Sequence, residues 1–393
     1  MVINEELFDG SLEIDPKLQP DHAFSHLVAL PACKGVVLFA DSENRPVQLL
    51  IAANIRRTAR ARLYTEQIPG TSKRPEIASI VRRVFYVCSY NDFKAGLTYY
   101  TISKELWPDS YLELVSFAKL SLVKINASAK WPYFSIISSL PVSNEDAVFG
   151  PFQSRKSATD FVNALENAFL LCHRPELVDN PVKAASCPYL QMEKCPAPCV
   201  GKISKYQYLQ HLENAISAAS GNIDQLRSDM RKQMQMHCEN LEFELANHVK
   251  NQLDQLEHIT GYQYRWTGRL NDLAVLHIDL SAKVKIKGKR KKTQTFAAFL
   301  ITANRIHEFE PFDLVGVENF NELLSEKLTA ALPPVSFADR KQSSELTGLL
   351  CSFLYRSKPP GIWINCSPKA KQPLPDANKL AWMIKKRFEV ESL

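Results

Sequence analysis

The sequence predicts an α+β multidomain protein that contains a small α/β domain, a cysteine-cluster segment, an antiparallel helical hairpin and a C-terminal α/β domain. Its 393 residues exceed one average domain. Its 45% apolar and 23% charged residues are values typical of globular proteins. Strand-like and helical patterns alternate along the chain, which sets the boundaries at 1–25 (a lead-in), 26–145, 146–203, 204–260 and 265–393.

Charge and cysteine content narrow the class of protein. The net charge of +6 is compatible with nucleic acid but does not identify it. The chain opens on the polar stretch MVINEELFDG and contains no apolar run near the ~20 residues of a membrane span. We therefore expect a cytoplasmic protein with no membrane partner, in which nine cysteines stay reduced.

The first α/β domain begins with a strand hairpin. GVVLFAD and VQLLIAA flank the polar turn SENRP within residues 28–53. The stretch NIRRTARARL follows, and its helix formers predict a helix rich in arginine. The stretch WPYFSIISSLPV (131–142) predicts a further strand.

Four cysteines follow a predicted helix at 156–171. They lie at Cys172, Cys187, Cys195 and Cys199, in a proline-rich loop. Zinc sites usually pair ligands two to four residues apart, and only the last pair is that close. Four thiolates at irregular spacings also suit an iron–sulfur cluster, and free cysteines also serve as small buried hydrophobes. The residue types leave zinc, an iron–sulfur cluster and no metal open.

The next segment predicts two helices. Ser204 with Gln207 fits a capping box, and Gly221 with Asn222 fits a helix stop. Apolar residues then recur at intervals of three and four for more than 30 residues, which predicts one long second helix. This helix is predicted to join the first at Gly221 and to form an antiparallel hairpin with it. The apolar stripe comprises Ile223, Leu226, Met230, Met234, Cys238, Leu241, Leu245, Val249, Leu253 and Leu256.

The sequence of the C-terminal domain predicts a pair of strands, two helices and a last strand. The predicted strand pair consists of LAVLHIDL and TFAAFLIT. The predicted helices span residues 317–332 and 344–355, and a last strand is predicted at GIWINC. The link between the first two strands is strongly basic and suits DNA phosphates; a solvated loop that protects a sheet edge is the alternative. The candidate DNA contacts are Lys287, Lys289, Arg290, Lys291 and Lys292.

Several motifs in order resemble the UvrC family of excision-repair nucleases. KWPYFSI (130–136), DAVFGPF (146–152), CPYLQMEKCPAPCVG and SGN (220–222) match its middle region, and ENLEFELANHVKNQL (239–253) resembles its UVR motif. The resemblance runs from about 28 to about 365 and is strongest over 130–255. It implies a protein of nucleotide excision repair.

The resemblance also implies a cofactor and a partner. In the family, the four matching cysteines hold a [4Fe–4S] cluster, whose role here would be structural, with zinc as the alternative. The UVR-like hairpin implies docking to a UvrB-like protein, and packing within this chain alone is the competing interpretation. The candidate partner-binding residues are Leu241, Phe243, Leu245 and Val249.

The family begins with a GIY-YIG nuclease, and this chain departs from its chemistry. Val37 and Leu50 stand where the two catalytic tyrosines are expected, and Tyr99 stands near the position of the metal-binding glutamate. Valine and leucine carry no proton and make no hydrogen bond to water. Arg60 matches the catalytic arginine, with Arg62 as the other possibility. A Mg²⁺ or Mn²⁺ ion is implied only if the nuclease is active.

Four arginines of this degenerate GIY-YIG-like domain remain candidates for phosphate contact. They are Arg56, Arg57, Arg60 and Arg62, and a solvated helix face is the alternative. Residues 270–365 resemble only the segment that leads into the family's second nuclease. Asp272 and Asp279 read as isolated acids, and His277 as a packing or surface residue.

We therefore interpret the sequence as that of a catalytically inactive accessory protein that binds DNA, a UvrB-like protein or both. One alternative is an active structure-specific endonuclease that uses Arg60 with Tyr99 or Tyr100. Another is a protein-interaction scaffold without DNA affinity.

Overall fold

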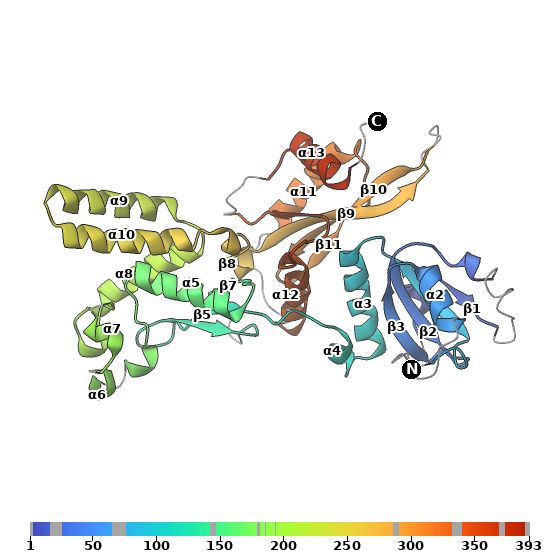
Figure 1. Ribbon diagram of the computed structural model, residues 1–393, viewed down its shortest axis with the longest axis horizontal. Helices are drawn as coiled ribbons and strands as arrows, with labels where there is room; N and C mark the ends of the chain where they lie inside the picture. Colours follow the sequence, from blue (N-terminus) through green and yellow to red (C-terminus); the bar gives the residue numbers. More distant parts are fainter. Residues whose placement is uncertain are drawn as a thin grey trace.

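The computed structural model describes residues 3–15, 26–64, 76–141, 147–178, 181–184, 186–192, 194–285, 291–331, 340–368 and 374–389. In these ranges the chain forms three four-stranded antiparallel sheets with helices packed on them (Figure 1). The predicted α+β class is therefore confirmed. None of the described helices is both long enough and apolar enough to span a membrane.

The N-terminal sheet has the order β1 (Gly10–Glu13), β4 (Arg83–Cys88), β2 (Gly35–Ala40) and β3 (Pro46–Ala52). The predicted hairpin of β2 and β3 is confirmed. Every residue of β2 is buried, because helices cover both faces of the sheet. One face packs against α2 (Ile55–Leu63) and the other against α3 (Asp92–Leu106). The short η1 (Glu5–Leu7), η2 (Leu27–Ala29) and α4 (Tyr111–Leu114) complete this region.

The middle sheet has the order β6 (Phe134–Ile137), β5 (Leu122–Ile125), β7 (Val148–Gly150) and β8 (Gly268–Arg269). It packs with α5 (Arg155–Ala168) and α8 (Lys205–Ala219) around one apolar core. The capping box of Ser204 and Gln207 at the start of α8 is confirmed. Strand β8 lies beyond the helical hairpin in sequence, so the chain returns to this sheet before it enters the C-terminal region.

The predicted single long helix is wrong. The chain forms α9 (Asp224–Glu239) and α10 (Phe243–His258), which pack against each other as an antiparallel hairpin. Helix α10 also packs on α5, and the turn of the hairpin lies at the left edge of the molecule (Figure 1). Leu241 adopts a left-handed conformation (φ 60°) between them. The Glu242 N–H donates to the His237 carbonyl at 2.8 Å, which closes the end of α9. The hairpin is therefore joined at Leu241 and not at Gly221.

The C-terminal sheet has the order β11 (Ile306–Glu308), β10 (Thr293–Thr302), β9 (Ala274–Val284) and β12 (Ile362–Asn365). Helices α11 (Val317–Ala331) and α13 (Ala377–Phe388) cover one face, and α12 (Arg340–Leu354) packs on the other. The predicted strand pair, both helices and the last strand are confirmed. A second apolar core joins Phe93 of α3, Leu122 of β5 and Phe299 of β10, so the three regions share buried surface.

Candidate functional site

The cysteine segment is a series of short helices between α5 and α8 along the chain. It contains η3 (Pro175–Leu177), α6 (Pro181–Ala184), α7 (Pro188–Gln191) and η4 (Pro198–Val200), each of which begins with proline. A proline at the first helical position has its fixed φ and missing N–H where a helix tolerates them. Ala197 and Gly201 adopt left-handed conformations on either side of η4. The prolines therefore stiffen a tightly wound loop.

The structure brings the four predicted cysteine ligands into one electrostatic neighbourhood. Burial, with smaller contributions from the charges of Cys195 and Cys199, raises the pKa of Cys172 to about 12. Burial also raises the pKa of Cys195, with contributions from Cys187 and Cys199. The thiols of Cys172 and Cys195 therefore hold their protons near neutral pH unless a bound cation takes the negative charge.

Two of these sulfurs accept backbone hydrogen bonds. The Arg174 N–H donates to the Cys172 sulfur, and the Ala197 N–H donates to the Cys195 sulfur. Both bonds lower the pKa of the thiol that accepts them, because they stabilise the thiolate. Bonds of this kind orient metal-bound thiolates and tune iron–sulfur clusters.

A buried histidine lies beside Cys172. The Nδ1 atom of His173 is 2.9 Å from Oε2 of Glu166, and its ring stacks on Tyr189 with centroids 4.2 Å apart. Its Nε2 atom is buried and has no hydrogen-bond partner among the described residues. Burial raises the pKa of Glu166 and opposes the bond to His173, which lowers it.

The cysteine segment offers sulfur as its main ligand atom. In the described part of the chain, no three His, Cys, Asp or Glu side chains are arranged to hold a single metal ion. The segment offers four thiols, two of which accept N–H···S bonds, and the buried His173 nitrogen, which has no hydrogen-bond partner among the described residues. These residues fit an iron–sulfur cluster in ligand type and in supporting hydrogen bonds.

The N-terminal sheet brings Val37 and Leu50 together. They are direct partners across β2 and β3 and pack in the same apolar cluster as the inner side of α2. Tyr99 packs with Val36 and Leu38 in the cluster on the opposite face, and burial raises its pKa. The structure therefore does not bring Tyr99 to Val37 and Leu50. Arg60 lies exposed on α2.

The four arginines of α2 do not share one exposed face. The Arg56 guanidinium donates to the carbonyls of Leu30 and Val28 at 2.8 and 2.7 Å. Arg62 is 8% exposed and bonds to the Gln48 side chain. Both side chains therefore fix the helix to its neighbours. Only Arg57 and Arg60 among the four are exposed and one helical turn apart.

The basic link between β9 and β10 is described only at its base. Lys287, Lys289 and Arg290 lie outside the described residues. Lys291 and Lys292 are exposed at the start of β10, and Lys283 and Lys285 are exposed on the other side of the link.

The tip of the α9–α10 hairpin is apolar and exposed. Leu241, Phe243 and Leu245 are 73%, 64% and 50% exposed, and Met236 beside them is 50% exposed. Val249 is 3% exposed and packs inside the protein, so it is unavailable to a partner. At the other end of the hairpin, Arg227 holds Glu257 with two hydrogen bonds of 2.6 and 3.0 Å.

His277 is a packing residue, as its sequence context predicts. It is fully buried and stacks on Trp363 with centroids 3.8 Å apart, and burial lowers its pKa to about 3. Its Nε2 atom is 3.9 Å from Asp279, but a neutral imidazole makes no salt bridge there. Asp279 belongs to no group of three His, Cys, Asp or Glu side chains that could hold a metal ion among the described residues. Its pKa is raised to about 6, mainly by burial. The negative charge of Asp92 also raises this pKa, whereas the positive charges of Lys34 and Arg387 lower it.

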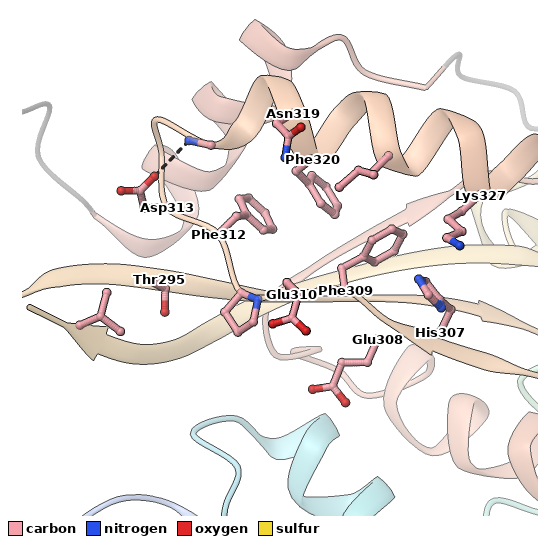
Figure 2. Close-up of a pocket in the computed structure, with 14 residues that line it drawn as sticks. Thr295, His307, Glu308, Phe309, Glu310, Phe312, Asp313, Asn319, Phe320 and Lys327 are labelled. Atoms are coloured by element: carbon pink, nitrogen blue, oxygen red, sulfur yellow. Dashed lines mark hydrogen bonds between the residues drawn. The ribbon is translucent and has the colours of Figure 1, made fainter. Parts of the chain in front are cut away.

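Sequence reasoning missed an open cavity of about 630 Å³ between the sheet and α11. Figure 2 shows Phe309, Phe312 and Phe320 along it, with His307 and Lys327 at one end. The rings of Phe312 and Phe320 stack with centroids 4.2 Å apart. The alternation of aromatic and charged residues in HEFEPFD (307–313) is the signal that marks it.

Comparison with known proteins places the cysteine segment in a shared domain. Residues 120–218 match the family described as UvrC/Cho excinuclease, middle domain. The chain is 26% identical over 240 residues to UvrABC system protein C of Caldicellulosiruptor saccharolyticus, a match covering 60% of this chain and 40% of the relative. The corresponding protein of Protochlamydia amoebophila is 26% identical, with 60% and 38% covered.

An archaeal relative gives a similar match. UvrABC system protein C of Methanosarcina acetivorans is 23% identical over 253 residues, which cover 64% of this chain and 47% of the relative. The chain thus spans about two fifths to one half of these curated relatives. No solved structure matches it.

Proposed function

This chain belongs to the UvrC family, and we propose that it acts in nucleotide excision repair as an accessory protein that binds a UvrB-like partner and DNA without cutting DNA. The observation that carries the proposal is the apolar tip of the α9–α10 hairpin. Leu241, Phe243 and Leu245 are exposed there, at the turn of the hairpin, which lies at the left edge of the molecule (Figure 1).

An exposed apolar tip on a helix pair is a means of docking to another helical element. Covering one large apolar side chain is worth about 1.5–3 kcal/mol, so Leu241 and Phe243 together supply much of the free energy of a modest complex. The segment 239–253, which resembles the UVR motif, contains these residues and supports a UvrB-like hairpin as the partner.

The cutting site of a GIY-YIG nuclease lacks its proton carriers here. Val37 and Leu50 face each other as apolar partners at the positions of the two catalytic tyrosines. Neither side chain can orient water or move a proton. Arg57 and Arg60 remain exposed and suit contact with backbone phosphates, as do the four described lysines beside the basic link.

The cysteine segment would hold a [4Fe–4S] cluster through Cys172, Cys187, Cys195 and Cys199. When bound, the cluster would cross-link α5 to the loop before α8, and its iron would carry the negative charge of the thiolates. The Arg174 and Ala197 N–H groups would hold two of the sulfurs in orientation. The proposed role is structural, because the segment lies between the middle sheet and α8.

Binding to the helical hairpin of a UvrB protein tests the proposal. We expect Leu241→Ala with Phe243→Ala to weaken binding of the full-length chain by about 100-fold in titration calorimetry, since about 3 kcal/mol of apolar contact is lost. Val315→Ala is the matched control, because Val315 is 75% exposed on a different element. Equal affinity of the double variant and the unsubstituted chain would exclude the hairpin tip as the docking surface.

A further inference from the structure

Two cysteines outside the cluster segment lie side by side in the N-terminal sheet. Gly35 of β2 is the direct partner of Cys88 of β4, and the Ser89 N–H continues the pairing to the Lys34 carbonyl at 2.9 Å. This register places Cys33 diagonally across from Cys88 on the same face of the sheet. Both side chains pack on the apolar cluster that contains Val37 and Ile55.

A glycine makes room for the contact between these cysteines. Gly35 stands directly opposite Cys88, and a Cβ atom there would lie 2.0 Å from the Val87 carbonyl oxygen. No side chain therefore covers Cys88 from the opposite strand, and the Cys33 side chain reaches it. The two side chains lie close enough for the Cys33 sulfur to affect the pKa of Cys88. Since the two sulfurs are already neighbours, a disulfide requires only a small closing movement.

The surroundings of Cys88 favour its protonated thiol. Burial, assisted by the neighbouring Cys33 side chain and the nearby Asp9 carboxylate, raises the pKa of Cys88 to about 12. Both cysteines are only half-buried, so a small oxidant can reach them. Tyr90, which is 40% exposed, donates its hydroxyl to the Cys88 sulfur.

We propose that Cys33 and Cys88 are a redox-active dithiol that a hydroperoxide converts to a disulfide. One cysteine of the pair, as its thiolate, attacks the terminal oxygen of the hydroperoxide, and the O–O bond breaks. That cysteine becomes a sulfenic acid, and the displaced oxygen takes up a proton and leaves as an alcohol or water. The sulfur of the other cysteine then attacks the sulfenic acid sulfur, the S–O bond breaks, and the proton of the second thiol leaves with the hydroxyl as water. Two thiols are oxidised, and one peroxide is reduced.

The disulfide would act on the joint between two sheets. Cys88 leads through Ser89 and Tyr90 to Asn91, whose side-chain amide donates to the Leu280 carbonyl of β9 at 3.1 Å. Lys34 forms an ion pair with Asp92 at the start of α3. Linking Cys33 to Cys88 therefore fixes the segment through which the N-terminal sheet contacts the C-terminal sheet.

Peptide mapping after peroxide treatment tests the proposal on the full-length chain. Cys33 is the sole cysteine of tryptic peptide 18–34, and Cys88 is the sole cysteine of peptide 84–94. After treatment with hydrogen peroxide and alkylation of the remaining thiols, we expect the two peptides as one species, lighter by two hydrogens than their sum. Dithiothreitol should restore the two separate peptides.

Matched variants separate this pair from other thiols. Cys33→Ser and Cys88→Ser should each abolish the linked species, and Cys238→Ser, at an exposed cysteine on α9, should leave it unchanged. The proposal is overturned if both peptides of the unsubstituted chain stay separate and alkylated after peroxide treatment. It is also overturned if Cys33 is linked to a cysteine other than Cys88. Neither outcome depends on partner binding, so this test is independent of the proposed function.

Discussion

Tyr100 of α3 donates a hydrogen bond of 2.6 Å to Glu345 of α12, so the N-terminal region is tied to the C-terminal region through a buried carboxylate. Tyr111 donates to the other oxygen of Glu345 at 2.5 Å, and Glu345 is 6% exposed. A carboxylate that accepts two hydroxyls satisfies the hydrogen-bonding needs of all three side chains in an apolar setting.

Removing one of these hydroxyls should destabilise the whole protein. We expect Tyr100→Phe to lower the free energy of unfolding by about 1–3 kcal/mol, because a hydrogen bond to a charged group is lost. Tyr206→Phe is the control, since Tyr206 is 71% exposed. Thermal unfolding of both variants measures the difference, and equal midpoints for the two would show that the buried link contributes no stability.

The turn of the α9–α10 hairpin allows folding and binding to be separated. Leu241 holds a left-handed conformation that glycine adopts without strain. We expect Leu241→Gly to stabilise the hairpin by about 1 kcal/mol and at the same time to weaken UvrB binding, because an exposed apolar side chain is lost. Thermal unfolding and calorimetric titration of one variant measure the two effects. A simultaneous loss of stability and affinity would contradict the role assigned to Leu241.

The proposed cluster predicts the metal content of anaerobically purified protein. We expect about four iron and four acid-labile sulfide per chain, with loss of both in Cys187→Ala. Cys351→Ala is the control, because Cys351 is buried in a different core and should not affect iron. A result of stoichiometric zinc without iron would contradict the iron–sulfur cluster and would show that the cysteines bind zinc.

Asp279 and His277 give opposite dependences of stability on pH. The folded-state pKa of Asp279 is raised to about 6 from 3.8, so its folded state binds more protons and loses stability as pH rises between these values. The pKa of His277 is about 3 in the folded state and 6.5 in the unfolded state. His277 therefore contributes stability above about pH 6.5, and this contribution is lost as the pH falls below that value. The two effects oppose each other between about pH 4 and pH 6.

Asp279→Asn should remove one of these effects and retain the acceptor for the Leu280 N–H. Relative to the unsubstituted chain, the variant should gain little at pH 4 and about 3 kcal/mol at pH 7, since the pKa shift is about two units. Denaturant unfolding across this range measures the gain, with the exposed Asp109→Asn as control. A gain that is the same at every pH would show that Asp279 does not titrate as proposed.

The α9–α10 hairpin shows what the periodicity of apolar residues predicts correctly and what it does not predict. Apolar spacing predicted helices on both sides of residue 241, and they are present. The stripe continues through the break because both arms place apolar residues on their shared face, and no glycine or proline marks Leu241. Local patterns predict helix type well, whereas a turn that depends on one strained residue leaves no local signal.

Long-range partners explain the other differences. The charge pattern of α2 predicted a cationic face, but Arg56 and Arg62 find acceptors on η2 and β3 that only folding brings near. Cys33 and Cys88 become neighbours through sheet register across more than fifty residues. By contrast, the capping box of Ser204 and the β2–β3 hairpin depend on adjacent residues, and both were predicted correctly.

The central claim is that this protein binds its targets without cutting DNA, and a nicking assay tests it most directly. Purified full-length chain is incubated with damaged and branched duplexes in Mg²⁺ or Mn²⁺, with Arg60→Ala as the matched variant. The account predicts no cleavage above a no-protein control, because Val37 and Leu50 offer no proton carrier. Metal-dependent cleavage by the unsubstituted chain that disappears in Arg60→Ala would contradict the account and establish an active nuclease.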